Sequence, residues 1–128
     1  MHRFSGILLI LIAVLFTGLG IYAASNPAKF MAEYDLIPKT GKGAAEVRCF
    51  FGGTYLSWAA MITLAGLRPG LRQGLLAAIA ISLGCIAVLR IPSLMLEGLP
   101  AVNGPAMIAE GLIAALAAVL AMRPSRAV

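Results

Sequence analysis

Ionisable side chains stand at the ends of apolar runs in this sequence, where they can pair with one another or hold a polar group of a ligand. Five of them come from separate stretches of the chain: Glu46, Arg48, Arg90, Glu97 and Glu110. A charge that faces lipid costs at least about 2.5–3.5 kcal/mol near the membrane centre and less towards its edge. We therefore expect these side chains to face other helices and to form one cluster.

Three roles are open to such a cluster. Arginine–glutamate pairs can hold helices together and fix their register, which is the commonest use of such pairs. The same groups can bind a ligand, because ionisable residues embedded in membrane spans are candidates for function. A proton relay is the least favoured role, since it needs a continuous chain of ionisable groups and the other half of the spans has none.

Residues for covalent or metal chemistry are scarce. The one histidine is His2, so the serines have no histidine partner within the apolar segments. Cys49 and Cys85 show no spacing typical of zinc or haem sites, and we interpret them as small apolar packing residues. We predict no catalytic residue, no metal and no required cofactor, although a quinone or a lipid is a possible ligand.

The composition is that of a membrane protein. Of 128 residues, 61% are hydrophobic and 12% charged, and the mean hydropathy is +0.96. Soluble domains carry about 25% charged residues. The net charge of +5 is spread between apolar runs, so we expect membrane lipids as partners, with a larger membrane complex or a homo-oligomer as further possibilities, and no nucleic acid.

We predict one all-α domain, residues 1–128, folded as an integral membrane four-helix bundle. Four segments approach the roughly 20 apolar residues that a spanning helix needs: 5–24, 47–67, 73–89 and 105–122. The first segment also has features of a signal peptide, but its apolar stretch exceeds the usual ~7–15 residues. We expect it to be retained as a span.

The connections between these spans differ in character. Asn26 as N-cap and Pro27 as first residue predict a short helix in the membrane interface, running to about Tyr34. "PKTGKG" then predicts a flexible hinge, and "RPG" predicts a tight turn between the second and third spans. The stretch "IPSLMLEGLPAVNGP" predicts a loop or a broken helix at the membrane surface.

Small and aromatic residues indicate where helices meet. Gly52 and Gly53 allow a partner backbone or a ligand to come close, and Tyr55 and Trp58 are expected to pack there or to line a cavity. In the last span, a stripe that contains Glu110 consists otherwise of alanines, which predicts a close helix contact, whereas the leucines of another stripe should meet lipid.

The distribution of basic residues predicts that both termini lie in the cytoplasm. The Lys and Arg counts on the two sides are tied at five each. The short connection that holds Arg68 and Arg72 is wholly basic, and short loops carry most weight in the positive-inside rule. All five acidic residues then lie in the outer half.

Two motifs resemble those of the bacterial membrane proteins grouped as domain of unknown function 4345, and the resemblance covers nearly the whole chain. "EVRCFFGG" is similar to the entry of that family's second span, with Phe51 in place of its usual tyrosine, which puts any hydroxyl role there in doubt. "LRIPSLMLEGLP" is similar to the stretch after its third span. The matching residues are Glu46, Arg48, Gly52, Gly53, Arg90, Ser93, Gly98 and Pro100.

The resemblance implies an inner-membrane four-helix protein without an assigned activity, loosely similar to the DoxX group. DoxX is linked to quinone-coupled thiosulfate oxidation, which is too remote to transfer. We expect a protein that binds a lipid or another lipophilic molecule at the charged cluster near the outer face. The alternatives are an accessory or assembly subunit of a larger membrane complex, respiratory or photosynthetic, and a quinone-linked membrane enzyme.

Overall fold

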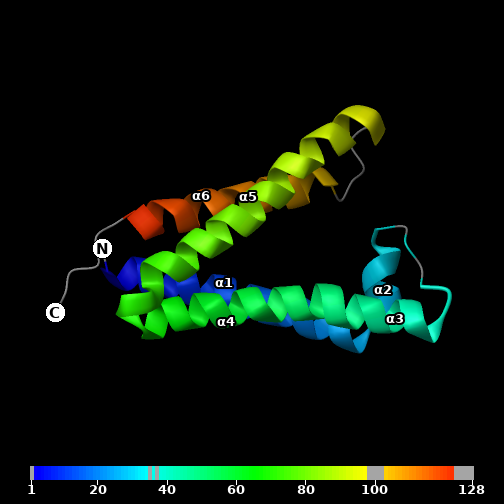
Figure 1. The fold of residues 1–128 in the computed structure, drawn as a ribbon, viewed down its shortest axis with the longest axis horizontal. Helices are drawn as coiled ribbons and strands as arrows, with labels where there is room; N and C mark the ends of the chain where they lie inside the picture. Colours follow the sequence, from blue (N-terminus) through cyan, green and yellow to red (C-terminus); the bar gives the residue numbers. More distant parts are fainter. Residues whose placement is uncertain (1, 35, 37, 98–102, 123–128) are drawn as a thin grey trace. The chain divides into compact units, whose positions relative to one another are not determined.

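The structure is a computed structural model that describes residues 2–34, 36, 38–97 and 103–122, with the side chains of 6–34, 36, 38–92, 95 and 105–122. All regular secondary structure within these ranges is helical (Figure 1). The elements in chain order are α1 (His2–Ser25), α2 (Pro27–Ala32), α3 (Gly41–Val47), the π-helical turn η1 (Arg48–Gly52), α4 (Gly53–Leu67), the 3₁₀ turn η2 (Pro69–Leu71), α5 (Arg72–Glu97) and α6 (Asn103–Met122).

Four helical segments are long and apolar enough to cross a membrane. They are Gly6–Ser25, Gly41–Leu67, Pro69–Pro92 and Pro105–Met122. The predicted fold class, all-α with four spans and a short helix between the first two, is therefore confirmed. Internal contacts group the chain into two compact units, Met1–Gly66 and Leu67–Val128. That residues 1–128 form one domain stays a prediction.

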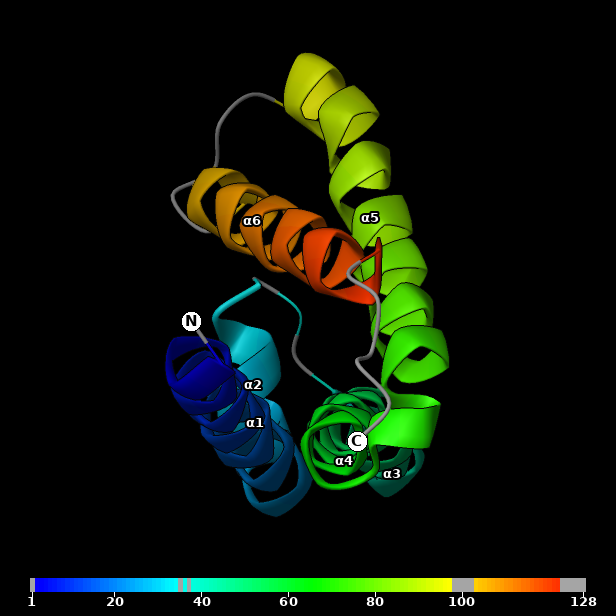
Figure 2. The same ribbon diagram turned by 90° about the vertical axis from the view of Figure 1, so that its left-hand side faces the viewer.

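In the first unit, α1 and α4 run side by side in opposite directions (Figure 2), and α2 packs against both α1 and α3. The backbones of α1 and η1 approach each other closely. A Cβ atom built on Gly52 would lie 3.2 Å from Ala24 Cβ and 3.3 Å from Gly20 O. A larger residue at position 52 would therefore push the two helices apart, which explains why this position holds glycine.

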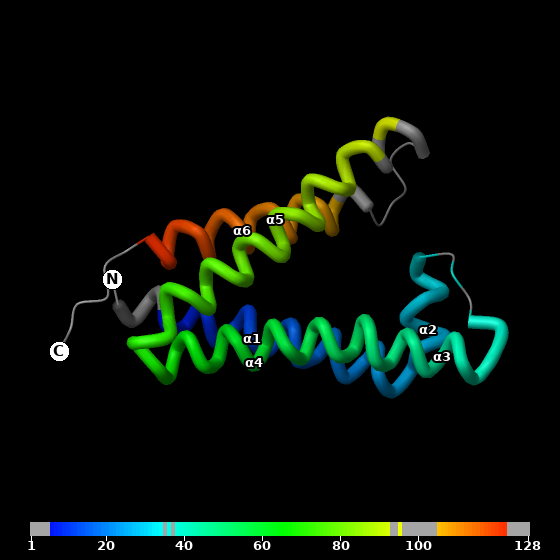
Figure 3. Tube along the Cα trace, in the orientation of Figure 1, coloured from blue at the N-terminus to red at the C-terminus, as the bar shows by residue number. Residues whose placement is uncertain are grey.

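The segments α3, η1 and α4 form one continuous helix, which begins earlier than expected (Figure 3). Thr40 caps its start, since its side chain accepts a hydrogen bond from the Gly43 N–H at 3.2 Å. The second half of the expected hinge "PKTGKG" is therefore the first turn of this helix. The cap explains the difference, because a side-chain acceptor at the N-cap satisfies a helix-end N–H and offsets the low helix propensity of two glycines.

In the second unit, α5 and α6 pack along each other, as Figures 1 and 2 both show. The most buried side chains of α5 are Leu76, Ile79 and Leu83. On α6, Ala114 and Ala117 are buried whereas Leu112 is 67% exposed. The expected small-residue contact stripe is thus confirmed at Ala114 and Ala117, whereas contact of the leucine stripe with lipid stays a prediction.

After the third span the sequence predicts a loop or a broken helix, and the loop is wrong for residues 91–97. The helix α5 continues through Pro92 to Glu97, and residues 98–102 lie outside the described part. Proline removes one backbone hydrogen bond from a helix but does not prevent its continuation. In an apolar environment the helix is the conformation that satisfies the remaining peptide groups, so spanning helices tolerate proline better than soluble ones.

The helix α2 begins at Pro27 as predicted but ends at Ala32, before the expected limit near Tyr34. Asn26 stands at the N-cap position without making a side-chain cap, and its Nδ2 instead donates to Ser25 Oγ at 3.0 Å. The expected capping role of the Asn26 side chain is therefore wrong.

Candidate functional site: two arginines of the spanning helices

Arg90 and Glu110 form a two-point ion pair between α5 and α6. Arg90 Nε donates to Glu110 Oε2 at 2.7 Å, and Arg90 Nη2 donates to Glu110 Oε1 at 2.9 Å. The two side chains are 20% and 18% exposed. Each residue lies about two helical turns from the connection between its helix and the other, so antiparallel packing brings them to the same level.

The geometry of this pair neutralises both charges in a partly buried position. A planar guanidinium matches a carboxylate with two parallel hydrogen bonds, which are shorter and stronger than bonds between neutral groups. Unpaired, either charge would be costly among apolar helices. The pair therefore explains how α5 and α6 carry ionisable groups inside segments of membrane-spanning length.

Arg48 has a different environment in the first unit. It is the first residue of η1, and its Nε donates to the Ala24 carbonyl oxygen at 3.1 Å. Ala24 belongs to the last turn of α1, where carbonyl groups lack partners within their own helix. The Arg48 side chain thus satisfies a helix end that is 24 residues away in sequence, while its residue surface remains exposed.

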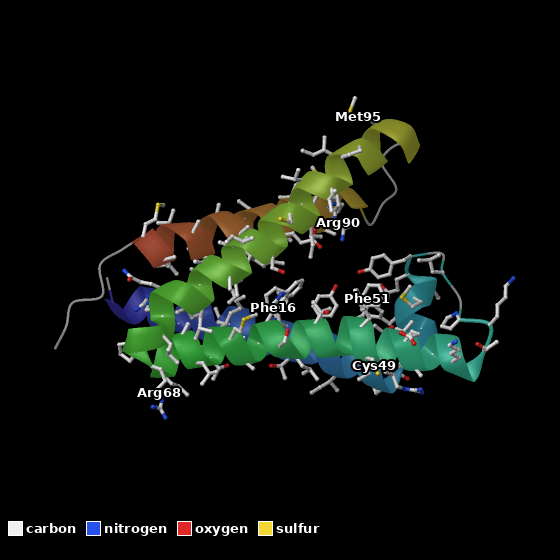
Figure 4. All side chains as sticks on the ribbon, viewed as in Figure 1. Phe16, Cys49, Phe51, Arg68, Arg90 and Met95 are labelled. Atoms are coloured by element: carbon white, nitrogen blue, oxygen red, sulfur yellow. The ribbon has the colours of Figure 1, made fainter. Side chains whose placement is uncertain are left out.

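The π-helical turn that carries Arg48 widens the helix next to this contact. The Gly53 N–H lies within reach of the carbonyl oxygens of Arg48, Cys49 and Phe50 instead of bonding one of them alone. Single π turns inside α-helices are rare and occur frequently at functional sites. Here the turn presents Phe51 towards α2 and Cys49 on the opposite side of the helix (Figure 4).

The other two members of the expected cluster are Glu46 and Glu97. Glu46 is exposed in the last turn of α3. Glu97 is the last residue of α5, and its side chain lies outside the described residues. Arg48 belongs to the first unit and the Arg90–Glu110 pair to the second. The gathering of all five into one cluster therefore stays a prediction.

The four residues expected to pack or to line a cavity behave differently. Gly52 is buried against α1, whereas Gly53 is exposed and a Cβ atom added to it would meet nothing within 4 Å. Tyr55 and Trp58 contact each other edge to face at 5.5 Å between ring centroids. Phe16 of α1 contacts both rings, at 6.1 and 5.2 Å. Tyr55 and Trp58 therefore pack with one another and with α1.

The residue that sequence reasoning underrated is Phe30. Its ring is 3% exposed and contacts the rings of Tyr22, Tyr34, Phe51 and Tyr55, with centroid distances between 5.5 and 6.1 Å. It belongs to a buried cluster of the first unit that contains Ala23, Phe30, Met31 and Val47. The available signal in the sequence was the helical spacing of Phe30, Met31 and Tyr34, which indicated one face of a short helix but not its partner.

A second contact joins α2 to α1. The Tyr22 hydroxyl donates to Glu33 Oε1 at 3.2 Å, so one of the acidic residues outside the expected cluster binds α1 directly.

Within the part of the chain that the structure describes, no group of three or more His, Cys, Asp and Glu side chains is arranged to hold a metal ion. The described polar side chains can form ion pairs and accept or donate hydrogen bonds.

Comparison with known proteins identifies the family. The model of the family described as Domain of unknown function (DUF4345) matches residues 4–121. Searches of the curated proteins and of the solved structures give no match. The likeness to the DoxX group stays a prediction. Since the match covers both arginine motifs and all four spanning helices, the chain belongs to the DUF4345 family, a family defined by a domain of unknown function.

Proposed function

We propose that this chain is a multi-pass protein of the bacterial inner membrane that binds a lipid or another lipophilic anion near the outer face, with Arg48 as its anchor. Both termini lie in the cytoplasm in this proposal, so that the junction of α3 and η1 lies at the periplasmic side. The observation that carries the proposal is the incomplete pairing of Arg48.

Arg48 retains donors for a ligand. Among the residues that the structure describes, its hydrogen-bond partner is the carbonyl oxygen of Ala24, which uses Nε. A guanidinium has five N–H donors in a fixed fork. The four N–H groups of the terminal nitrogens suit a phosphate or a carboxylate, and the bond to Ala24 holds the side chain in place for that contact.

The Arg90–Glu110 pair is less suited to anchor an anion. Its carboxylate already accepts two hydrogen bonds from Arg90, so a ligand anion would have to displace Glu110 and leave that carboxylate unpaired. Removal of one partner from a buried pair is strongly unfavourable. We therefore assign this pair to the stability of the α5–α6 hairpin and Arg48 to the ligand.

Native mass spectrometry of the gently solubilised full chain tests the proposal. Delipidated protein is titrated with phosphatidylglycerol, which is anionic, and with phosphatidylethanolamine, which has no net charge. We expect Arg48→Ala to weaken retention of phosphatidylglycerol about tenfold, the effect of one charge-assisted hydrogen bond. Arg48→Lys should retain part of the affinity.

The matched control is Lys42→Ala, which removes the same charge from an exposed position of α3. Retention that falls equally in Arg48→Ala and Lys42→Ala would mean that only net charge matters, and it would overturn the assignment of Arg48. Equal retention in wild type and Arg48→Ala would overturn it as well.

The other two functions expected from the sequence stay predictions that the same spectra distinguish. A polypeptide that co-purifies in fixed stoichiometry would replace lipid binding by the role of an accessory subunit. A retained quinone would favour the quinone-linked enzyme. For that enzyme, turnover should be lost in Arg48→Ala or Glu110→Gln while the fold survives.

A further inference from the structure

A basic turn joins two of the spanning helices at the start of α5. The Leu71 N–H donates to the Arg68 carbonyl oxygen at 2.9 Å, which closes the turn, and Arg72 is the first residue of α5. Leu67 and Leu71 are 70% and 56% exposed. The turn therefore alternates arginines with exposed leucines, and Figure 4 shows the Arg68 side chain extending outward from it.

Arg68 and Arg72 have no acidic residue near them in the sequence. The sequence contains no Asp or Glu between Glu46 and Glu97, and the first turn of α5 holds no acidic residue. The Nε atom of Arg72 is buried and has no hydrogen-bond partner among the described residues. A buried donor without an acceptor is unfavourable, and more so when it carries charge. The position calls for an acceptor that the described chain does not supply.

The surroundings point to the chemistry of that acceptor. The turn lies between Gly41–Leu67 and Pro69–Pro92, two segments long and apolar enough to cross a membrane. A connection between two spans lies at a membrane surface, where the accessible anions are the phosphates of lipid headgroups. Guanidinium groups match phosphate oxygens with two parallel hydrogen bonds, and the exposed leucines suit the acyl chains beneath the headgroup.

We propose that Arg68 and Arg72 bind the phosphate of an anionic lipid at this turn. The phosphate accepts hydrogen bonds from the accessible part of the Arg72 guanidinium, whose Nε has no partner among the described residues, and Arg68 contacts the same headgroup from the exposed side. This site is at the opposite end of the Gly41–Leu67 segment from Arg48, and it does not depend on the function proposed for Arg48.

Nanodiscs of phosphatidylcholine with and without phosphatidylglycerol provide the test. The full chain is released from them and analysed by native mass spectrometry. All variants in this test carry Arg48→Ala, which removes the other anion site proposed above. We expect this parent chain to retain phosphatidylglycerol and the chain with Arg68→Ala/Arg72→Ala added to retain it about tenfold less. The control Lys39→Ala/Lys42→Ala removes the same charge from exposed positions and should retain it as the parent chain does. Equal losses in the two double variants would overturn the proposal.

Two further arms keep the result interpretable. Arg72 is partly buried, so its alanine variant can fail to fold. In that case the retention of phosphatidylglycerol is compared between Arg68→Ala and Lys42→Ala, which are both changes at exposed positions. Inorganic phosphate added to nanodiscs of phosphatidylcholine alone distinguishes the source of the anion. If phosphate ions bind in an arginine-dependent way while phosphatidylglycerol does not, the lipid site is refuted.

Discussion

Arg90 and Glu110 hold α5 and α6 together by two hydrogen bonds of 2.7 and 2.9 Å between one guanidinium and one carboxylate. The first prediction concerns this pair. Arg90→Met and Glu110→Leu each remove both hydrogen bonds of the pair, and each should lower the free energy of unfolding by about 2 kcal/mol, as expected for hydrogen bonds to charged groups. The double variant should lose less than the sum, because the interaction between the two side chains is lost only once.

The measurement is the unfolding of the four proteins in mixed micelles titrated with a denaturing detergent, followed by circular dichroism. Arg68→Ala serves as the control, since Arg68 is exposed and its removal should change the free energy of unfolding little. A coupling energy near zero between positions 90 and 110 would show that the pair does not stabilise the hairpin.

The second prediction uses two adjacent glycines with opposite surroundings. Gly52→Ala would bring a Cβ atom within 3.2 Å of Ala24 Cβ and 3.4 Å of Ala24 N. These atoms belong to a helix and cannot move locally, so the substitution should destabilise the first unit by about 1–3 kcal/mol. Gly53→Ala meets nothing within 4 Å and should stabilise the helix by up to about 1 kcal/mol.

Thermal unfolding of both variants in the same detergent checks this contrast. Because the two substitutions add the same atom one residue apart, differences in hydrophobicity and expression cancel. If Gly52→Ala raised the unfolding temperature as much as Gly53→Ala, the close approach of α1 and η1 would be refuted.

The third prediction concerns the aromatic core under α2. Phe30→Ala removes a side chain that is 3% exposed and contacts four other rings. For a buried phenylalanine this substitution costs about 3–5 kcal/mol, and we expect α2 to detach and to become a site of rapid tryptic cleavage at Lys29. The control is Phe50→Ala, because Phe50 is 71% exposed.

Limited proteolysis followed by mass spectrometry measures the rate of cleavage in each variant. Wild type and Phe50→Ala should be cut slowly at this position. Slow cleavage of Phe30→Ala, equal to that of the wild type, would mean that α2 is held by other contacts, among which the bond from Tyr22 to Glu33 is the first candidate.

The spans were predictable from the sequence because long apolar runs bounded by charges have one stable conformation in a membrane. Charges embedded in spans need partners, so the sequence predicted that arginines and glutamates would pair. Arg90 with Glu110 was one of several possible pairs. The choice among several arginines and glutamates was not predictable. It depends on the level at which α5 and α6 pack, which short-range patterns do not contain.

The π-helical turn and the extent of α5 show why the rest escaped prediction. A π turn disrupts the regular hydrogen bonds of the α-helix, and it persists because tertiary contacts offset this loss. Here these contacts are the packing of Gly52 on α1 and the hydrogen bond from Arg48 to Ala24. Pro92 indicated a break in the helix, but α5 continues past it. Phe30 was placed on an interfacial helix, although its ring packs in the core of the first unit.

The fourth prediction concerns the orientation of the chain in the membrane. In a background of Cys49→Ser and Cys85→Ser, single cysteines are introduced at Lys39 and at Gly70, on either side of the Gly41–Leu67 segment. Gly70 tolerates the change because an added Cβ atom meets nothing within 4 Å. The short, basic Arg68–Arg72 turn should remain in the cytoplasm. A membrane-impermeable maleimide should therefore label Lys39→Cys in cells whose inner membrane is intact, and Gly70→Cys only after that membrane is permeabilised.

The reverse pattern would invert the orientation and move Arg48 to the cytoplasmic side, whereas labelling of both in intact cells would mean that Gly41–Leu67 does not cross the membrane.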